Sequence, residues 1–142
     1  MSNISVAIIE DNRGLQESLS VLISGTPGFA LAGAFSDAES ALVKIPELKP
    51  DVILMDINLP GINGIECTAR LKISMPSVQI IIQTVYEESE KIFESLRAGA
   101  TGYLLKRTPP AKMLEAIQDV YNGGSPMSGE IARMVVRSFQ ST

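Results

Sequence analysis

The strongest constraint on the fold is a regular alternation of short apolar, β-rich segments with segments of helical periodicity. Five segments of each kind follow one another between residue 4 and about residue 121. This alternation is typical of right-handed β–α–β units, in which helices cover both faces of a parallel sheet. The sequence therefore predicts an α/β fold with one five-stranded parallel sheet.

Five apolar segments are the predicted strands. The third has no polar interruption, as expected for a strand that is covered on both faces. The predicted strands are residues 4–9, 29–35, 52–55, 78–82 and 102–105.

Apolar residues at helical spacing predict the intervening helices, at about residues 15–23, 36–46, 65–74, 87–98 and 113–120. Ser36-Asp-Ala-Glu39 has the pattern of a capping box, so we expect Ser36 to begin the second helix. Pro46 is expected to end it, because proline lacks the backbone N–H that a helix interior needs.

Composition excludes several classes of function. The 142 residues suffice for one domain, and a single cysteine excludes an intrachain disulfide. The chain has no histidine, which excludes Ser-His-Asp and Cys-His catalysis and histidine-ligated zinc. No apolar run approaches a membrane span and the N-terminus does not resemble a signal peptide, so we expect a cytoplasmic protein without a membrane partner. The 16 acidic and 12 basic residues give no basic bias, so we expect no direct binding of nucleic acid by this segment.

Polar residues gather where the predicted strands end. Glu10 and Asp11 follow the first strand, Asp56 follows the third, Thr84 follows the fourth and Lys106 follows the fifth. Carboxyl ends of parallel strands meet at one edge of a sheet, so these side chains should lie together. Three carboxylates and one lysine leave an excess of negative charge, which a divalent cation can neutralise, and oxygen ligands suit Mg²⁺. A carboxylate beside Mg²⁺, a lysine and a hydroxyl is the arrangement that phosphoryl transfer to aspartate needs.

Five sequence segments, in order, resemble the receiver domain of two-component response regulators. The resemblance covers residues 4 to about 122 and is carried by Ile8-Ile-Glu-Asp-Asn12, Val52-Ile-Leu-Met-Asp56, Leu59-Pro-Gly-Ile-Asn-Gly64, Thr84 and Ala98-Gly-Ala-Thr-Gly-Tyr-Leu-Leu-Lys106. It implies a flavodoxin-like (βα)5 fold with strand order 2-1-3-4-5 and a signalling domain rather than an enzyme with its own product.

The resemblance also assigns roles to residues. Asp56 would accept a phosphoryl group from a sensor histidine kinase or a phosphotransfer protein. Lys106 would pair with the phosphoryl oxygens, while Thr84 and Tyr103 would act as the switch. Mg²⁺ would be held by Glu10, Asp11, Asp56 and the backbone carbonyl of Asn58.

Two positions depart from the commonest receiver pattern. Arg107 stands directly after the lysine, where many receivers have proline, and Val85 follows Thr84, where a smaller alanine is frequent. We expect the bulkier Val85 to restrict access to the phosphoryl site and so to affect rates.

The C-terminal part resembles the NarL/FixJ subgroup, whose members usually carry a LuxR-type helix-turn-helix domain that binds DNA. We expect a receiver domain over residues 1–124, with residues 125–142 as a C-terminal helix or the start of a linker to an absent output domain. The helix should begin after Ser128 and carry one apolar stripe, namely Ile131, Met134, Val135 and Phe139. The stripe has two equally supported interpretations: it packs on the domain, or it belongs to a linker. A chain that stops in the linker is favoured over a natural stand-alone receiver.

Other classes of the same fold fit less well. The acidic first loop would repel a flavin phosphate, the second acid of the haloacid-dehalogenase motif is missing, and no P-loop is present. A pure interaction module would not need the acids and the lysine. Phosphorylation is expected to favour a homodimer through the fourth helix, fifth strand and fifth helix, or through the first and fifth helices, and the sequence does not choose between them.

Overall fold

Five parallel strands form one sheet in the order β2-β1-β3-β4-β5, which confirms the predicted architecture and strand order. The computed structural model describes residues 3–140. The strands are β1 (Ile4–Ile9), β2 (Phe29–Phe35), β3 (Val52–Met55), β4 (Gln79–Thr84) and β5 (Gly102–Leu105).

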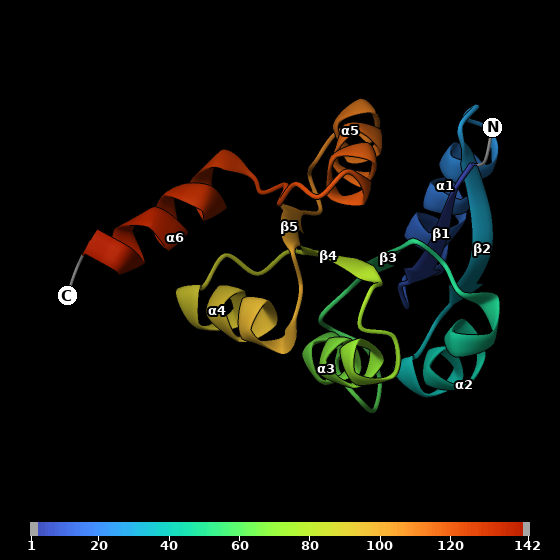
Figure 1. The fold of residues 1–142 in the computed structure, drawn as a ribbon, viewed down its shortest axis with the longest axis horizontal. Helices are drawn as coiled ribbons and strands as arrows, with labels where there is room; N and C mark the ends of the chain where they lie inside the picture. The colour runs from blue at the N-terminus through green and yellow to red at the C-terminus, as the bar shows by residue number, and fades with distance from the viewer. Residues whose placement is uncertain (1–2, 141–142) are drawn as a thin grey trace.

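Helices cover both faces of the sheet, α1 and α5 on one side and α2, α3 and α4 on the other (Figure 1). In chain order they are α1 (Arg13–Ser24), α2 (Ala38–Leu48), α3 (Gly64–Ser74), α4 (Ser89–Ala98), α5 (Pro110–Tyr121) and α6 (Gly129–Gln140). None of the helices within residues 3–140 is long and apolar enough to cross a membrane.

Side chains that alternate along the strands fill two apolar layers. In β1, Val6 and Ile8 pack toward α1 and α5, whereas Ala7 and Ile9 pack toward α2 and α3. Burying one large aliphatic side chain stabilises a fold by about 1.5–3 kcal/mol. A slip of one residue would exchange the two faces of a strand, so this alternation fixes the register that the functional site depends on.

The predicted start of α2 was wrong by one residue. Asp37, rather than Ser36, is the N-cap, and its side chain accepts a hydrogen bond from the Ser40 N–H at 2.7 Å. The Glu39 side chain does not reach back toward the cap. Instead its Oε2 accepts from the Ile62 N–H at 3.0 Å, so a contact with the β3–α3 loop replaces the capping box.

The predicted end of α2 was also wrong, because Pro46 lies inside the helix. Proline removes one helical donor, but the residues after it keep theirs. The Lys49 N–H donates to the Ile45 carbonyl at 2.9 Å across the proline, and the helix ends at Lys49 with a left-handed φ of 50°.

The fourth strand occupies residues 79–84 rather than 78–82. Pairing with β5 extends β4, since Gln83 is opposite Leu104 and Thr84 is opposite Leu105. Thr84 is therefore a residue of the strand and not of the loop that follows.

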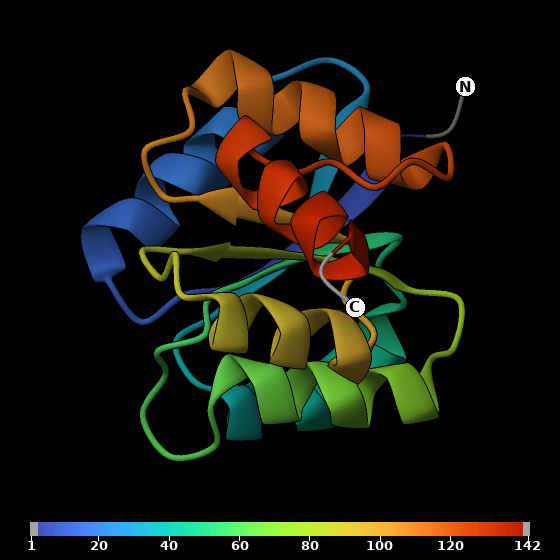
Figure 2. The same ribbon diagram turned by 90° about the vertical axis from the view of Figure 1, so that its left-hand side faces the viewer.

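Residues 126–128, which we call the strap, run along the outer edge of β5. The Tyr103 N–H donates to the Pro126 carbonyl at 3.0 Å, and the Ser128 N–H donates to the Tyr103 carbonyl at 3.3 Å. From the strap, α6 crosses this edge of the sheet between α5 and α4 (Figure 2).

The α6 stripe packs on the domain over its first part. Ile131 is fully buried, Met134 and Val135 are half-buried against the core, and Phe139 is 79% exposed. The interpretation of a helix that packs on the domain therefore holds for three of the four stripe residues.

Replacing Gly64 by alanine is expected to lower the free energy of unfolding by about 1–3 kcal/mol, because its Cβ would overlap the backbone carbonyl of Asp56. Urea denaturation measures the change. Gly14→Ala is the control: Gly14 lies in α1, and its Cβ would meet only Asn12 Oδ1 at 3.5 Å, an ordinary contact, so equal or slightly higher stability is expected. Equal effects of the two substitutions would contradict this account of Gly64.

Candidate functional site

Backbone hydrogen bonds place three of the predicted site residues at the carboxyl edge of the sheet. Each of these residues directly follows the last residue of its strand. Its backbone N–H donates to a carbonyl at the end of the neighbouring strand. The bonds are Glu10 N–H to Phe35 O (2.9 Å), Asp56 N–H to Ile9 O (3.0 Å) and Lys106 N–H to Thr84 O (2.9 Å). The sheet itself therefore fixes where these side chains start.

The Lys106 ammonium lies between two buried carboxylates. Its Nζ is 2.9 Å from Asp56 Oδ2 and 2.9 Å from Glu10 Oε1. The Glu10 and Asp56 side chains are 2% and 3% exposed, and the Lys106 side chain is 22% exposed. Breaking such a pair leaves a charge buried without its partner, so the lysine and the two acids must act as a unit.

Asp11 completes a cluster of three carboxylates. Oxygen atoms of Glu10, Asp11 and Asp56 lie within 4.8 Å of one another, and Asp11 is the exposed member. The three acids against Lys106 leave a net charge of about −2 at neutral pH. An exposed entry, oxygen ligands and this excess charge fit a divalent cation such as Mg²⁺.

The pKa values of Glu10 and Lys106 are both raised by their surroundings in the cluster. Burial raises the pKa of Glu10 above its usual 4.5, although the Asn12 N–H and the Lys106 ammonium oppose the change. Burial opposes the charged form of Lys106, but its hydrogen bonds to Glu10 and Asp56 outweigh burial and raise its pKa. Lys106 is therefore fully charged at neutral pH.

The loop after β3 forms one wall of the site. The Asn58 N–H points at Asp56 Oδ1 over 3.4 Å, and the Asn58 side chain is exposed. The Gly64 N–H donates to the Ile57 carbonyl at 2.8 Å, which holds the loop closed. In the loop after β1, the Asn12 N–H donates to Glu10 Oε2 at 3.0 Å.

Thr84 and Tyr103 are joined through Tyr86. The Tyr86 N–H lies 3.4 Å from Thr84 Oγ1, and the Tyr103 hydroxyl donates to the Tyr86 carbonyl at 3.0 Å. Tyr103 is fully buried, and burial raises the pKa of its hydroxyl. Val85, between the two contacts, is 68% exposed.

Arg107 has partners that the sequence did not indicate. Its Nη2 lies 2.7 Å from each Glu130 carboxylate oxygen, in α6, and 3.6 Å from Glu87 Oε1, in the β4–α4 loop. From the sequence, Arg107 stands out because many receivers have a proline at this position. No local pattern signals pairs that are 20 and 23 residues apart.

The cluster and the fold together define a class: a parallel α/β domain with buried acids and one lysine at the carboxyl edge of its sheet. The model of the response regulator receiver domain family matches residues 6–118. The chain belongs to this family.

Similarity to known proteins supports the same family. The response regulator GacA of Pseudomonas viridiflava is 36% identical over 138 residues, which are 96% of this chain and 64% of GacA. The chain thus spans somewhat less than two thirds of that relative.

Solved structures also match. A LuxR-family two-component response regulator from Aurantimonas sp. SI85-9A1 is 31% identical with a TM-score of 0.89, covering 96% of this chain and 98% of that one. A DNA-binding response regulator of the LuxR family from Staphylococcus aureus is 25% identical with a TM-score of 0.79, covering 84% of this chain and 99% of that one. These relatives support the NarL/FixJ-type subgroup.

Replacing Lys106 by methionine is expected to destabilise the chain by about 1–3 kcal/mol at pH 7, because Glu10 and Asp56 then repel each other while buried. The loss should shrink as the pH falls. A carboxyl with a raised pKa binds its proton more tightly in the folded chain than in the unfolded one, so protonation of Glu10 begins at a pH above its ordinary 4.5 and relieves the repulsion as the pH falls.

Urea denaturation at several pH values measures both effects. Lys112→Met is the control, because the Lys112 side chain is 71% exposed and its pair with Glu115 spans 3.9 Å. A loss that is the same at every pH would argue against the repulsion.

Proposed function

We propose that this receiver domain accepts a phosphoryl group on Asp56 and passes the resulting change to an output. The observation that carries the proposal is the buried pair of Asp56 with Lys106 beside Glu10. A nearly buried carboxylate held at the carboxyl edge of the sheet, beside the exposed Asp11, is placed to act as a nucleophile.

The step transfers one group. An Asp56 oxygen forms a bond to phosphorus while the bond from phosphorus to the donor's leaving group breaks, with phosphohistidine or acyl phosphate as the class of donor. Mg²⁺, when bound by Glu10, Asp11, Asp56 and the Asn58 carbonyl, supplies charge neutralisation. Lys106 then exchanges its pair with Asp56 for one with the phosphoryl oxygens, and the Thr84 hydroxyl donates to them.

The change is then propagated to the surface. Movement of Thr84 toward the phosphoryl group shifts Tyr86, whose carbonyl holds the Tyr103 hydroxyl. This is a charge change at one site that biases a two-state element. Receiver domains are generally signalling domains without an enzymatic product, and we extend that to this chain, with dephosphorylation assisted by its own residues.

The partners follow from the family. A sensor histidine kinase or phosphotransfer protein supplies the phosphoryl group in the cytoplasm. With the receiver unit over residues 1–124, the output is transcription through a DNA-binding domain reached through residues 125–142. LuxR-family relatives and the length of GacA beyond the matched part support this. A homodimer on phosphorylation completes the proposal, and an interaction module without DNA-binding output is the alternative.

Incubation with acetyl phosphate and Mg²⁺ is expected to add one phosphoryl group, measured by intact-mass spectrometry. Asp56→Asn should abolish the gain. Asp51→Asn is the matched control, since Asp51 precedes β3 where Asp56 follows it, and its carboxylate accepts the Ser5 N–H, a bond that asparagine preserves. If Asp56→Asn still gained the mass of one phosphoryl group, the acceptor would be a residue other than Asp56.

Mg²⁺ is expected to stabilise the chain. At ten times its Kd, a ligand of the folded state contributes about 1.4 kcal/mol, or about 4 °C in Tm. Asp11→Asn should remove most of the shift, because Asp11 is the exposed carboxylate of the cluster. Glu17→Gln, an exposed acid on α1, should retain it. The same shift in all three proteins in differential scanning calorimetry would contradict the metal site.

A further inference from the structure

The strap and α6 are attached to the domain at the strand that carries Tyr103. In addition to the two strap bonds of Tyr103, the Leu105 N–H points at the Ser128 hydroxyl over 3.4 Å. The backbone of β5 therefore has partners in β4 on one side and in the strap on the other.

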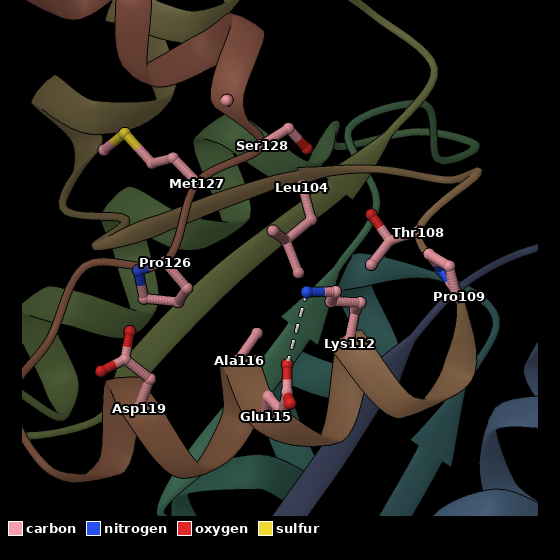
Figure 3. A pocket seen from close by; sticks show the side chains of 11 residues that line it. Leu104, Thr108, Pro109, Lys112, Glu115, Ala116, Asp119, Pro126, Met127 and Ser128 are labelled. Carbon is pink, nitrogen blue, oxygen red and sulfur yellow. Dashed lines mark ion pairs between the residues drawn. The ribbon is translucent and has the colours of Figure 1, made fainter.

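The strap lies tightly against β5 but not against α5. A Cβ on Gly102 would lie 3.1 Å from the Pro126 carbonyl oxygen, a tight contact that would force the strap to shift by a few tenths of an ångström. On the other side of the strap, a groove lies between the strap and α5 (Figure 3). The residues of α5 that line it include Lys112, Glu115 and Asp119. The position of the strap thus depends on β5 more than on α5.

A charged bridge fixes the first turn of α6. We call Arg107 with its partners Glu87 and Glu130 the Arg107 bridge. Arg107 and Glu130 are both about 60% exposed, so an ordinary ion pair between them would contribute little to the stability of the fold. Here the single nitrogen Nη2 lies 2.7 Å from both Glu130 oxygens, and hydrogen bonds between two charged groups are stronger than those between neutral ones. Because Arg107 directly follows Lys106, the bridge joins α6 to the backbone of the site.

The Tyr103 ring is enclosed by the same elements. It is fully buried in the apolar layer that also contains Ile131 and, at its margin, Met127 and Met134. The strap and α6 occupy the outer edge of β5 (Figure 2). A ring that turned outward past this edge would meet them, so the inward ring and the docked α6 belong to one conformation.

We propose that α6 is part of the switch: docking of α6 and occupancy of the phosphoryl site stabilise each other through Tyr103 and the Arg107 bridge. The inference rests on the proposed function, in which movement of Thr84 toward the phosphoryl group is passed through Tyr86 to the Tyr103 hydroxyl. Coupling between two sites is reciprocal, so it is measurable from either end.

The first test measures α6. The protein, residues 1–142, is incubated with Mg²⁺ and BeF₃⁻, a phosphoryl mimic, and hydrogen exchange is followed by mass spectrometry. Exchange of the backbone amides of residues 131–140 is expected to slow several-fold relative to Mg²⁺ alone. Equal exchange at saturating BeF₃⁻ would overturn the coupling.

The second test measures the site. Glu130→Gln removes one charge of the Arg107 bridge from an exposed position and should fold normally. Its affinity for BeF₃⁻, measured by calorimetric titration with Mg²⁺ present, is expected to fall about two- to fivefold. Glu66→Gln is the matched control, because Glu66 pairs with Arg70 at 3.0 Å on the exposed side of α3, and its affinity should not change.

The outcomes separate the two proposals. Failure of the unaltered chain to bind BeF₃⁻ would overturn the proposed function and the coupling with it. Normal binding with unchanged exchange in α6 would overturn the coupling alone, and the same affinity in Glu130→Gln would overturn its path through the Arg107 bridge. Weaker binding in Glu66→Gln as well would show a general effect of surface charge and so overturn the assignment to the Arg107 bridge.

Discussion

The repulsion among three carboxylates, relieved by one lysine, is the interaction on which the rest of this structure depends. Glu10 and Asp56 are almost fully buried, and burial of an unpaired carboxylate is costly. Lys106 bonds to both, yet a net negative charge remains at the edge of the sheet. That remaining negative charge suits a divalent cation, and in the proposed function the cation and Lys106 would together offset the negative charge of an incoming phosphoryl group.

The fold accommodates the repulsion among these carboxylates because the parallel sheet holds the charged residues in place. Each follows a strand whose apolar side chains are packed into the two layers of the core. Hydrogen bonds from the backbone extend the sheet one residue beyond the strands, which fixes the origin of each side chain. A rigid arrangement of this kind needs little reorganisation when charge arrives, which favours phosphoryl transfer.

A continuous set of contacts leads from the site to the surface. Thr84 is linked to Tyr86, and Tyr86 to the Tyr103 hydroxyl, while the Tyr103 backbone holds the strap. The Arg107 bridge provides a second link, from the residue next to Lys106 to the start of α6. Two links that end on the same helix make α6 the element best placed to respond to the site.

The sequence by itself determined the fold class, the strand order through family resemblance, and the residues that gather at the carboxyl edge. It could do so because strand periodicity is local, and because strand ends of a parallel sheet necessarily meet. It misplaced the boundaries of α2, where Asp37 caps the helix and Pro46 lies inside it, since a loop contact decides the role of Glu39. Only the tertiary structure decided the pairing of Arg107 with Glu130, the enclosure of Tyr103 and the docking of α6. These depend on side chains brought together across 20 or more residues, and an amphipathic stripe does not specify the surface it packs against.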